Sequence, residues 1–195
     1  MSPLEIAGSA LGFIQILLLI RRSVWNFPVA MAMVTCIGIV LAEAKLYAEA
    51  GLQVFFFVVN AWGWFVWSQA KGADEAIAVN WMGNGARAGW LAATAALSVT
   101  LGLLLARFTD AALPMADSAV AGMSVAAQFL LTFRRIENWV LWIVVDVVSI
   151  ALYVARDLPL LTLLYTAFLA LSVLGLREWT KSARSQPGGT REVFA

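Results

Sequence analysis

Histidine is absent from this chain of 195 residues, and cysteine occurs once, at Cys36. The first absence excludes histidine-based acid–base catalysis and histidine-ligated metal sites, and the single cysteine excludes an intramolecular disulfide. Charge is scarce as well, because 13% of the residues are charged, against about 25% in an ordinary soluble domain. The net charge of +1 provides no positive field for a polyanion, so nucleic acid is excluded as a partner.

Hydrophobic residues make up 62% of the chain, which is more than a water-soluble fold of this size can bury. Apolar stretches of about 17–25 residues are typical of membrane-spanning helices. The sequence therefore predicts an all-α membrane protein with seven transmembrane helices in the lipid bilayer. We expect these helices at residues 6–20, 26–41, 50–67, 89–106, 118–133, 138–154 and 158–176.

The basic residues predict the orientation of these spans, because positively charged loops stay in the cytoplasm. Seven spans place three basic residues on one side of the membrane, namely Lys45, Arg107 and Arg156. The other ten fall on the opposite side, namely Arg21, Arg22, Lys71, Arg87, Arg134, Arg135, Arg177, Lys181, Arg184 and Arg191. We therefore predict a multi-pass protein of the cell inner membrane, with its N-terminus outside and its C-terminus in the cytoplasm.

An internal repeat becomes visible when the sequence is shifted by 112 positions against itself. The segment 22–27 then falls on 134–139, and the GxxxW motif that ends at Trp67 falls on the one that ends at Trp179. Three spans, one linker span and three spans give both repeats the same orientation, as in the SWEET transporters, which bind substrate between their repeats. We predict a first repeat at 6–67, a loop and linker helix at 68–117 with its span at 89–106, a second repeat at 118–179 and a cytoplasmic tail at 180–195.

Asp146 is the only acidic residue in the middle of any expected span. A charge there costs about 2.5–3.5 kcal/mol on insertion scales and marks a functional position by default. Steps of three and four residues put aromatic and hydroxyl side chains on the same helix face: Trp139, Trp142, Ser149 and Tyr153. An aromatic-walled site with an anion suits a flat cationic ligand. The alternative is a structural acid that is hydrogen-bonded to neighbouring helices.

The third span carries a second candidate stripe, which alternates amide and aromatic groups: Gln53, Phe57, Asn60 and Trp64, followed by Trp67. The repeat register carries Gln53 onto Tyr165 and Asn60 onto Ser172, so both innermost helices are expected to present a polar line to the axis, and Tyr165 is a further candidate for substrate binding. Gln128 and Asn138 are weaker candidates. An amide can simply bridge two helices, and an asparagine at a helix start can cap that helix.

Three segments of the chain resemble the PnuC family of vitamin transporters. They are LYAEAGLQVFFFVVNAWGWFVWSQ in the third span, RRIENWVLWIVVDVVSIALY leading into the sixth, and LYTAFLALSVLGLREW in the seventh. The resemblance implies a SWEET-like seven-helix body that carries dephosphorylated B-type vitamins, namely nicotinamide riboside, thiamine or riboflavin. It also implies facilitated diffusion, with a cytoplasmic vitamin kinase that traps the vitamin by phosphorylation. We expect no enzymatic activity and no cofactor, and a homo-oligomer stays open.

The acid at Asp146 bears on the choice among these vitamins. An anion there suits the pyridinium ring of nicotinamide riboside or the thiazolium ring of thiamine better than neutral riboflavin. Some members of the family that the chain resembles carry asparagine at this point, which leaves the substrate open. Nicotinamide riboside is our first choice, thiamine is the alternative, and riboflavin comes third.

Three other classes of membrane protein are less favoured. A retinal protein needs a lysine in its last span to form a Schiff base, and residues 158–176 contain none. A membrane hydrolase or transferase needs a paired acid, a histidine–serine pair or a metal cluster, and the spans offer one central acid and no histidine. A channel usually shows a ring of equivalent groups, whereas the repeat register carries Asp146 onto Val34.

Overall fold

The computed structural model describes residues 3–43, 47–70, 77–109, 113–155, 157 and 159–185. These residues form seven helices: α1 (Pro3–Ile20), α2 (Asn26–Glu43), α3 (Tyr47–Ala70), α4 (Asn84–Phe108), α5 (Pro114–Thr132), α6 (Glu137–Ala155) and α7 (Pro159–Ser185). Each helix contains a stretch that is long and apolar enough to cross a membrane. For the described part of the chain, the predicted all-α fold with seven apolar helices is therefore confirmed.

The helices match the predicted spans except at two ends, where a helix continues beyond its apolar stretch. Helix α4 begins at Asn84, so the loop predicted at 68–88 is too long. Helix α7 continues to Ser185, so Lys181 lies on a helix where a tail was predicted at 180–195. Hydropathy detects only the part of a helix that lies in lipid. Arginine, glutamate and lysine are good helix formers and extend α7 beyond it, whereas Ala86, Arg87 and Ala88 favour the helix at the start of α4.

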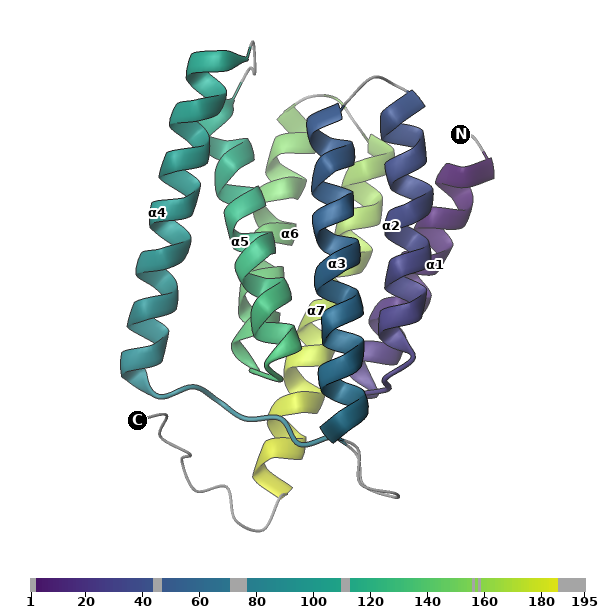
Figure 1. Cartoon of the computed structure of the whole chain (residues 1–195), viewed down its shortest axis with the longest axis vertical. Coiled ribbons are helices and arrows are strands. Elements are labelled where there is room, and N and C mark those ends of the chain that lie inside the picture. Colours follow the sequence, from purple (N-terminus) through teal and green to yellow (C-terminus); the bar gives the residue numbers. More distant parts are fainter. Residues whose placement is uncertain are drawn as a thin grey trace. The chain divides into compact units, whose positions relative to one another are not determined.

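The chain divides into two compact units, Met1–Ala78 and Val79–Ala195. In the first unit, α2 packs against α1 and α3. In the second unit, α5 packs against α4 and α6, and α6 also packs against α7 (Figure 1). Each unit is therefore a set of helices that pack in chain order, and α4, which was predicted to be a linker helix, belongs to the second unit. The repeat boundaries at 67 and 118 stay predictions.

The turn before α2 and the turn before α6, which lie 112 positions apart, share one backbone conformation. Arg22 has a φ of 55° and Arg134 a φ of 60°, in the left-handed region that few residues other than glycine adopt. Each arginine donates its backbone N–H to an equivalent carbonyl, that of Leu19 at 2.8 Å and that of Leu131 at 2.9 Å. The chain thus reverses in the same way at both places.

An asparagine at the start of the following helix is hydrogen-bonded to each of these turns. Nδ2 of Asn26 donates to the carbonyl of Ser23 at 2.7 Å, and Nδ2 of Asn138 donates to the carbonyl of Arg135 at 2.6 Å. Both asparagine side chains are fully buried. Their equivalence in sequence is therefore matched by an equivalence in hydrogen bonding.

Each unit also contains an edge-to-face pair of aromatic rings at equivalent positions. Phe27 contacts Trp67 with 5.1 Å between the ring centroids, and Trp139 contacts Trp179 with 5.5 Å. The glycine of each GxxxW motif packs against the first ring of its pair, so closely that an added Cβ would overlap the ring. Glycine is therefore required there by the close approach of ring and backbone.

An extended segment at residues 79–82, which we call the strap, leads into α4. The backbone N–H of Asn80 donates to the carbonyl of Arg134 at 3.2 Å, and the N–H of Ile136 donates to the carbonyl of Asn80 at 3.1 Å. The side chains of Val79 and Ile136 are buried. The strap is thus fixed to the turn between α5 and α6.

Basic residues gather at one end of the second unit. The strap places the turn with Arg134 close to the start of α4, which carries Arg87. The ring contact between Trp139 and Trp179 brings the C-terminal part of α7, with Arg177, to the same end. We call this the basic end, and whether it faces the cytoplasm stays a prediction. Four of the counted basic residues lie outside the described residues, namely Lys45, Lys71, Arg156 and Arg191.

Candidate functional site

Asp146 lies on α6 with its carboxylate directed at α7. Its side chain is 4% exposed, and its Oδ2 accepts a hydrogen bond from Oγ of Ser172 at 2.9 Å. Among the described residues, Ser172 is the only hydrogen-bond partner of this carboxylate, so Oδ1 keeps its acceptor capacity. Ser172 was not among the predicted site residues. The sequence signal for it is the repeat register, which carries Asn60 onto Ser172.

Three contacts between α6 and α7 recur every seven residues on both helices, and the Asp146 hydrogen bond is the middle one. At the basic end, Trp139 meets Trp179 as described above. Beyond the acid, Tyr153 meets Tyr165 edge to face, with 5.0 Å between the ring centroids. Seven residues are close to two helical turns, so the three contacts follow one line, which we call the α6–α7 seam. The face of α6 selected from the sequence is therefore the face that packs against α7.

Two of the predicted site residues lie at the basic end of the second unit. Trp139 is buried against Trp179 and the backbone of Gly175. Asn138 is buried at the start of α6, where its Nδ2 donates to the backbone of the preceding turn, while its Oδ1 is buried without a hydrogen-bond partner among the described residues. The structure thus favours packing for Trp139, does not show the cap that was the alternative for Asn138, and leaves the binding role of Asn138 a prediction.

The remaining predicted residues of the second unit differ in accessibility. Trp142 is half-buried, whereas Ser149 and Gln128 are buried. Gln128 lies on α5, outside the α6–α7 seam, and has interactions of its own. Trp142 lies four residues before Asp146, on the same side of α6, and keeps part of its indole accessible. Among these predicted residues, Asp146 thus provides a buried charge, and Trp142 provides a half-buried aromatic face on the same side of α6.

The predicted stripe on α3 follows the edge of that helix's packed face. Asn60 is buried, and its Nδ2 donates to the carbonyl of Phe56 at 2.8 Å, while Gln53 is half-buried. Phe57 and Trp64 are 43% and 41% exposed. Three residues fall about 60° short of a full helical turn. The side chains of Phe57 and Asn60 therefore point in different directions around the helix axis, and one is exposed while the other is buried. The stripe therefore divides into an amide side, where Asn60 is buried and Gln53 half-buried, and an exposed aromatic side with Phe57 and Trp64.

A known protein family matches this chain over nearly its whole length. The family described as Nicotinamide mononucleotide transporter matches residues 2–181. The chain belongs to this family of transporters. The resemblance to PnuC proteins noted from the sequence is thereby confirmed. The protein is a multi-pass membrane transporter and not an enzyme. This assignment excludes the retinal protein and the membrane hydrolase that were considered from the sequence.

The relatives of this PnuC-type transporter are named for different vitamins. The nicotinamide riboside transporter PnuC of Escherichia coli (strain K12) is 27% identical, over 95% of this chain and 88% of that protein. The riboflavin/roseoflavin transporter RibM of Streptomyces davaonensis is 28% identical, over 92% of this chain and 85% of that protein. Sequence identity alone therefore does not select the substrate.

A solved structure supports the fold. The crystal structure of the vitamin B3 transporter PnuC superposes with a TM-score of 0.78 and covers 93% of this chain and 82% of that one. The two sequences are 23% identical, so the likeness bears on the fold alone. The fold described above is thus similar to that of the solved transporter.

Proposed function

We propose that the protein transports a dephosphorylated B-type vitamin with a cationic ring, and that nicotinamide riboside is this vitamin. The observation that carries the proposal is the buried Asp146, whose Oδ1 has no hydrogen-bond partner among the described residues and which shares a helix face with the accessible Trp142. A cationic ring is attracted by the anion and by the aromatic face. The relationship to the Escherichia coli transporter, which is named for nicotinamide riboside, supports the same choice.

Two other vitamins are weaker candidates. Thiamine carries a cationic thiazolium ring and meets the same charge requirement. Riboflavin is supported by the relationship to RibM. Its ring system is neutral, however, and gains nothing from the charge of Asp146, so we place it third.

The equivalent turns, asparagine hydrogen bonds and ring pairs support a parallel repeat of three helices, one linker helix and three helices. We propose that the basic end faces the cytoplasm of an inner membrane, which places the N-terminus outside. A cytoplasmic vitamin kinase would then meet the vitamin where it is released and trap it by phosphorylation. Homo-oligomerisation stays open.

Titration of the purified protein with nicotinamide riboside, thiamine and riboflavin tests the substrate. We expect nicotinamide riboside to bind most tightly and riboflavin at least about tenfold more weakly, because interactions with a charged group contribute about 1.5–3 kcal/mol. Isothermal titration calorimetry in detergent measures all three. The 1,4-dihydro form of nicotinamide riboside keeps the size and the amide but lacks the ring charge, and it should bind more weakly than the parent. Tightest binding of riboflavin would overturn the proposal.

Transport is expected to be passive. Proton-coupled carriers use relays of acids or histidines inside the membrane, and Asp146 is the only acid in the central part of any described helix. Liposomes that contain the protein and equal substrate on both sides should exchange labelled nicotinamide riboside. They should show no net accumulation when a pH or sodium gradient is imposed. Accumulation above equilibrium would contradict passive transport.

A further inference from the structure

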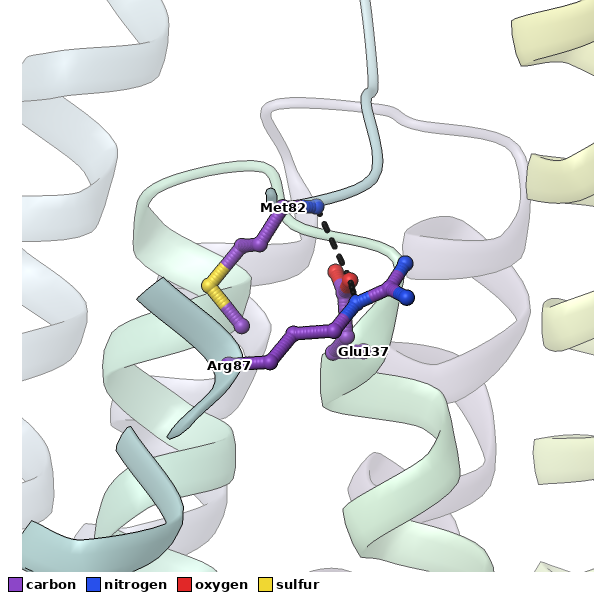
Figure 2. Close-up of polar contacts among 3 residues, drawn as sticks. All are labelled: Met82, Arg87 and Glu137. Carbon is purple, nitrogen blue, oxygen red and sulfur yellow. Dashed lines mark hydrogen bonds and ion pairs between the residues drawn. The ribbon is translucent and has the colours of Figure 1, made fainter. Parts of the chain in front are cut away.

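Glu137, the first residue of α6, accepts two hydrogen bonds with one oxygen. Oε1 receives the backbone N–H of Met82 in the strap at 2.8 Å and Nε of Arg87 on α4 at 2.8 Å (Figure 2). The Glu137 side chain is 12% exposed, and its Oε2 is buried without a partner in the described residues. The charge of Arg87 is therefore the main compensation for a carboxylate that has lost most of its water.

These bonds join three elements at the basic end. The strap pairs through Asn80 with the turn before α6, as described above, and Met82 continues this pairing to the Glu137 carboxylate. The guanidinium of Arg87 also lies 5.4 Å from the ring centroid of Trp81 in the strap. The strap, the first turn of α4 and the first turn of α6 are thus held as one cluster, which we call the clamp.

The clamp holds α6 on the side opposite to the seam. Nine residues separate Glu137 from Asp146, which corresponds to about two and a half helical turns and places the two side chains on opposite faces. Asp146 is bound to Ser172 of α7, and Glu137 is bound to α4 and the strap. Helix α6 is therefore fixed from both sides, and it cannot rotate about its axis without breaking one set of contacts.

The first unit shows what an unclamped start looks like. The residue equivalent to Glu137 is Trp25, which is 68% exposed and carries no charge. The turn, the asparagine hydrogen bond and the ring pair are equivalent in both units, whereas the carboxylate occurs in the second alone. The clamp is thus an addition to the shared framework, on the helix that carries Asp146 and Trp142.

We infer that Glu137 is a positioning residue for transport: with Arg87 and the strap it fixes the rotation of α6 and so directs Asp146 and Trp142 to the substrate. The inference rests on the proposed function in so far as these two side chains bind the vitamin. Glu137 itself lies about 13 Å along the helix from Asp146 and acts only through the helix.

Binding and exchange by four single variants and one double variant test this role. E137Q keeps an oxygen for the N–H of Met82 but removes the charge, and R87Q removes the partner. Each should weaken nicotinamide riboside binding or slow exchange by about three- to tenfold, in the range of couplings between contacting residues. The double variant should be no worse than either single one, and R87K should recover most of the loss. E178Q removes a carboxylate from the exposed part of α7 and should behave like the wild type.

A second readout requires no vitamin. In a Cys36→Ser background, the Trp142→Cys substitution places a thiol at the accessible position of α6. Its reaction rate with a maleimide should change when Glu137 is replaced by glutamine, because the helix can then rotate. An unchanged rate overturns the inference, as does a lower melting temperature with unchanged affinity and exchange. If E137Q does not fold, R87Q decides by the same measurements. If the wild type binds none of the vitamins, the proposed function fails, and the thiol rate still decides the role of Glu137.

Discussion

Replacing Asp146 with asparagine is expected to weaken the binding of nicotinamide riboside by about tenfold or more, because a hydrogen bond or contact with a charged group contributes about 1.5–3 kcal/mol. Riboflavin binding should change by less than this, because a neutral ring loses no charge term. Asparagine keeps the shape of the side chain and an oxygen for Ser172. The measurement is the ratio of the two dissociation constants, determined by calorimetry on both proteins.

The matched control for this variant is Ser172→Ala. It removes the hydrogen bond between α6 and α7 but leaves the carboxylate in place. If Asp146 recognises a cation, Ser172→Ala should lower the melting temperature slightly and leave the ratio of dissociation constants near that of the wild type. If Asp146 only joins two helices, both variants should act alike on both vitamins, and charge recognition would be refuted.

Replacing Gly175 with alanine is expected to destabilise the protein by about 1–3 kcal/mol, the cost of overpacking a well-packed interior. An added Cβ would lie 2.5 Å from the ring carbons of Trp139, which is itself buried against Trp179 and has no room to retreat. Gly63 faces Phe27 in the same way, and Gly63→Ala should give a similar loss. Thermal unfolding in detergent, followed by size-exclusion chromatography of the remaining folded protein, measures both.

Gly51 provides the control for these variants. It lies on α3, and an added Cβ would meet nothing within 4 Å. Gly51→Ala should therefore leave the melting temperature unchanged or raise it, because alanine is favoured over glycine in a helix by about 1 kcal/mol. Equal melting temperatures for all three variants would show that the two ring contacts are looser than the structure indicates.

The seven helices were predictable from the sequence because lipid imposes a simple requirement on a spanning segment. Each span must satisfy its backbone internally and be apolar over the thickness of the bilayer, so length and hydropathy are sufficient to find it. This requirement does not apply to the part of a helix that extends beyond the lipid, so hydropathy does not detect that part. The first turn of α4 and the last turns of α7 were missed for this reason, although both are helical.

The repeat register carried more information than hydropathy. It paired Arg22 with Arg134 and the two GxxxW motifs with each other on sequence alone. The structure shows the same left-handed turn at both arginines and gives the physical reason for the second match, which is a glycine that admits a ring. Glycine keeps its register there because an added Cβ would overlap that ring.

The contacts of the site were less predictable than its residues. Helical spacing identified the face of Asp146, but its partner Ser172 lies 26 positions further on. The clamp joins Glu137 to residues 50 and 55 positions away. Helical periodicity shows which residues share one face of a helix. It does not show which other helix packs against that face. The split of the α3 stripe into an amide side and an exposed aromatic side was missed for the same reason.

At each of the two equivalent turns, the backbone conformation and the charge of the side chain favour different residue types. A left-handed φ would be met most easily by glycine or asparagine, and a long side chain there costs about 1–3 kcal/mol. Both turns nevertheless carry arginine, so a cation is kept at each point where the chain reverses, in spite of the strain. During synthesis, each of these cations leaves the ribosome between two spanning helices, α1 and α2 or α5 and α6. In the orientation proposed above, a positive charge at that point opposes translocation of the connecting loop, so one side chain would serve both the folded turn and the insertion of the chain.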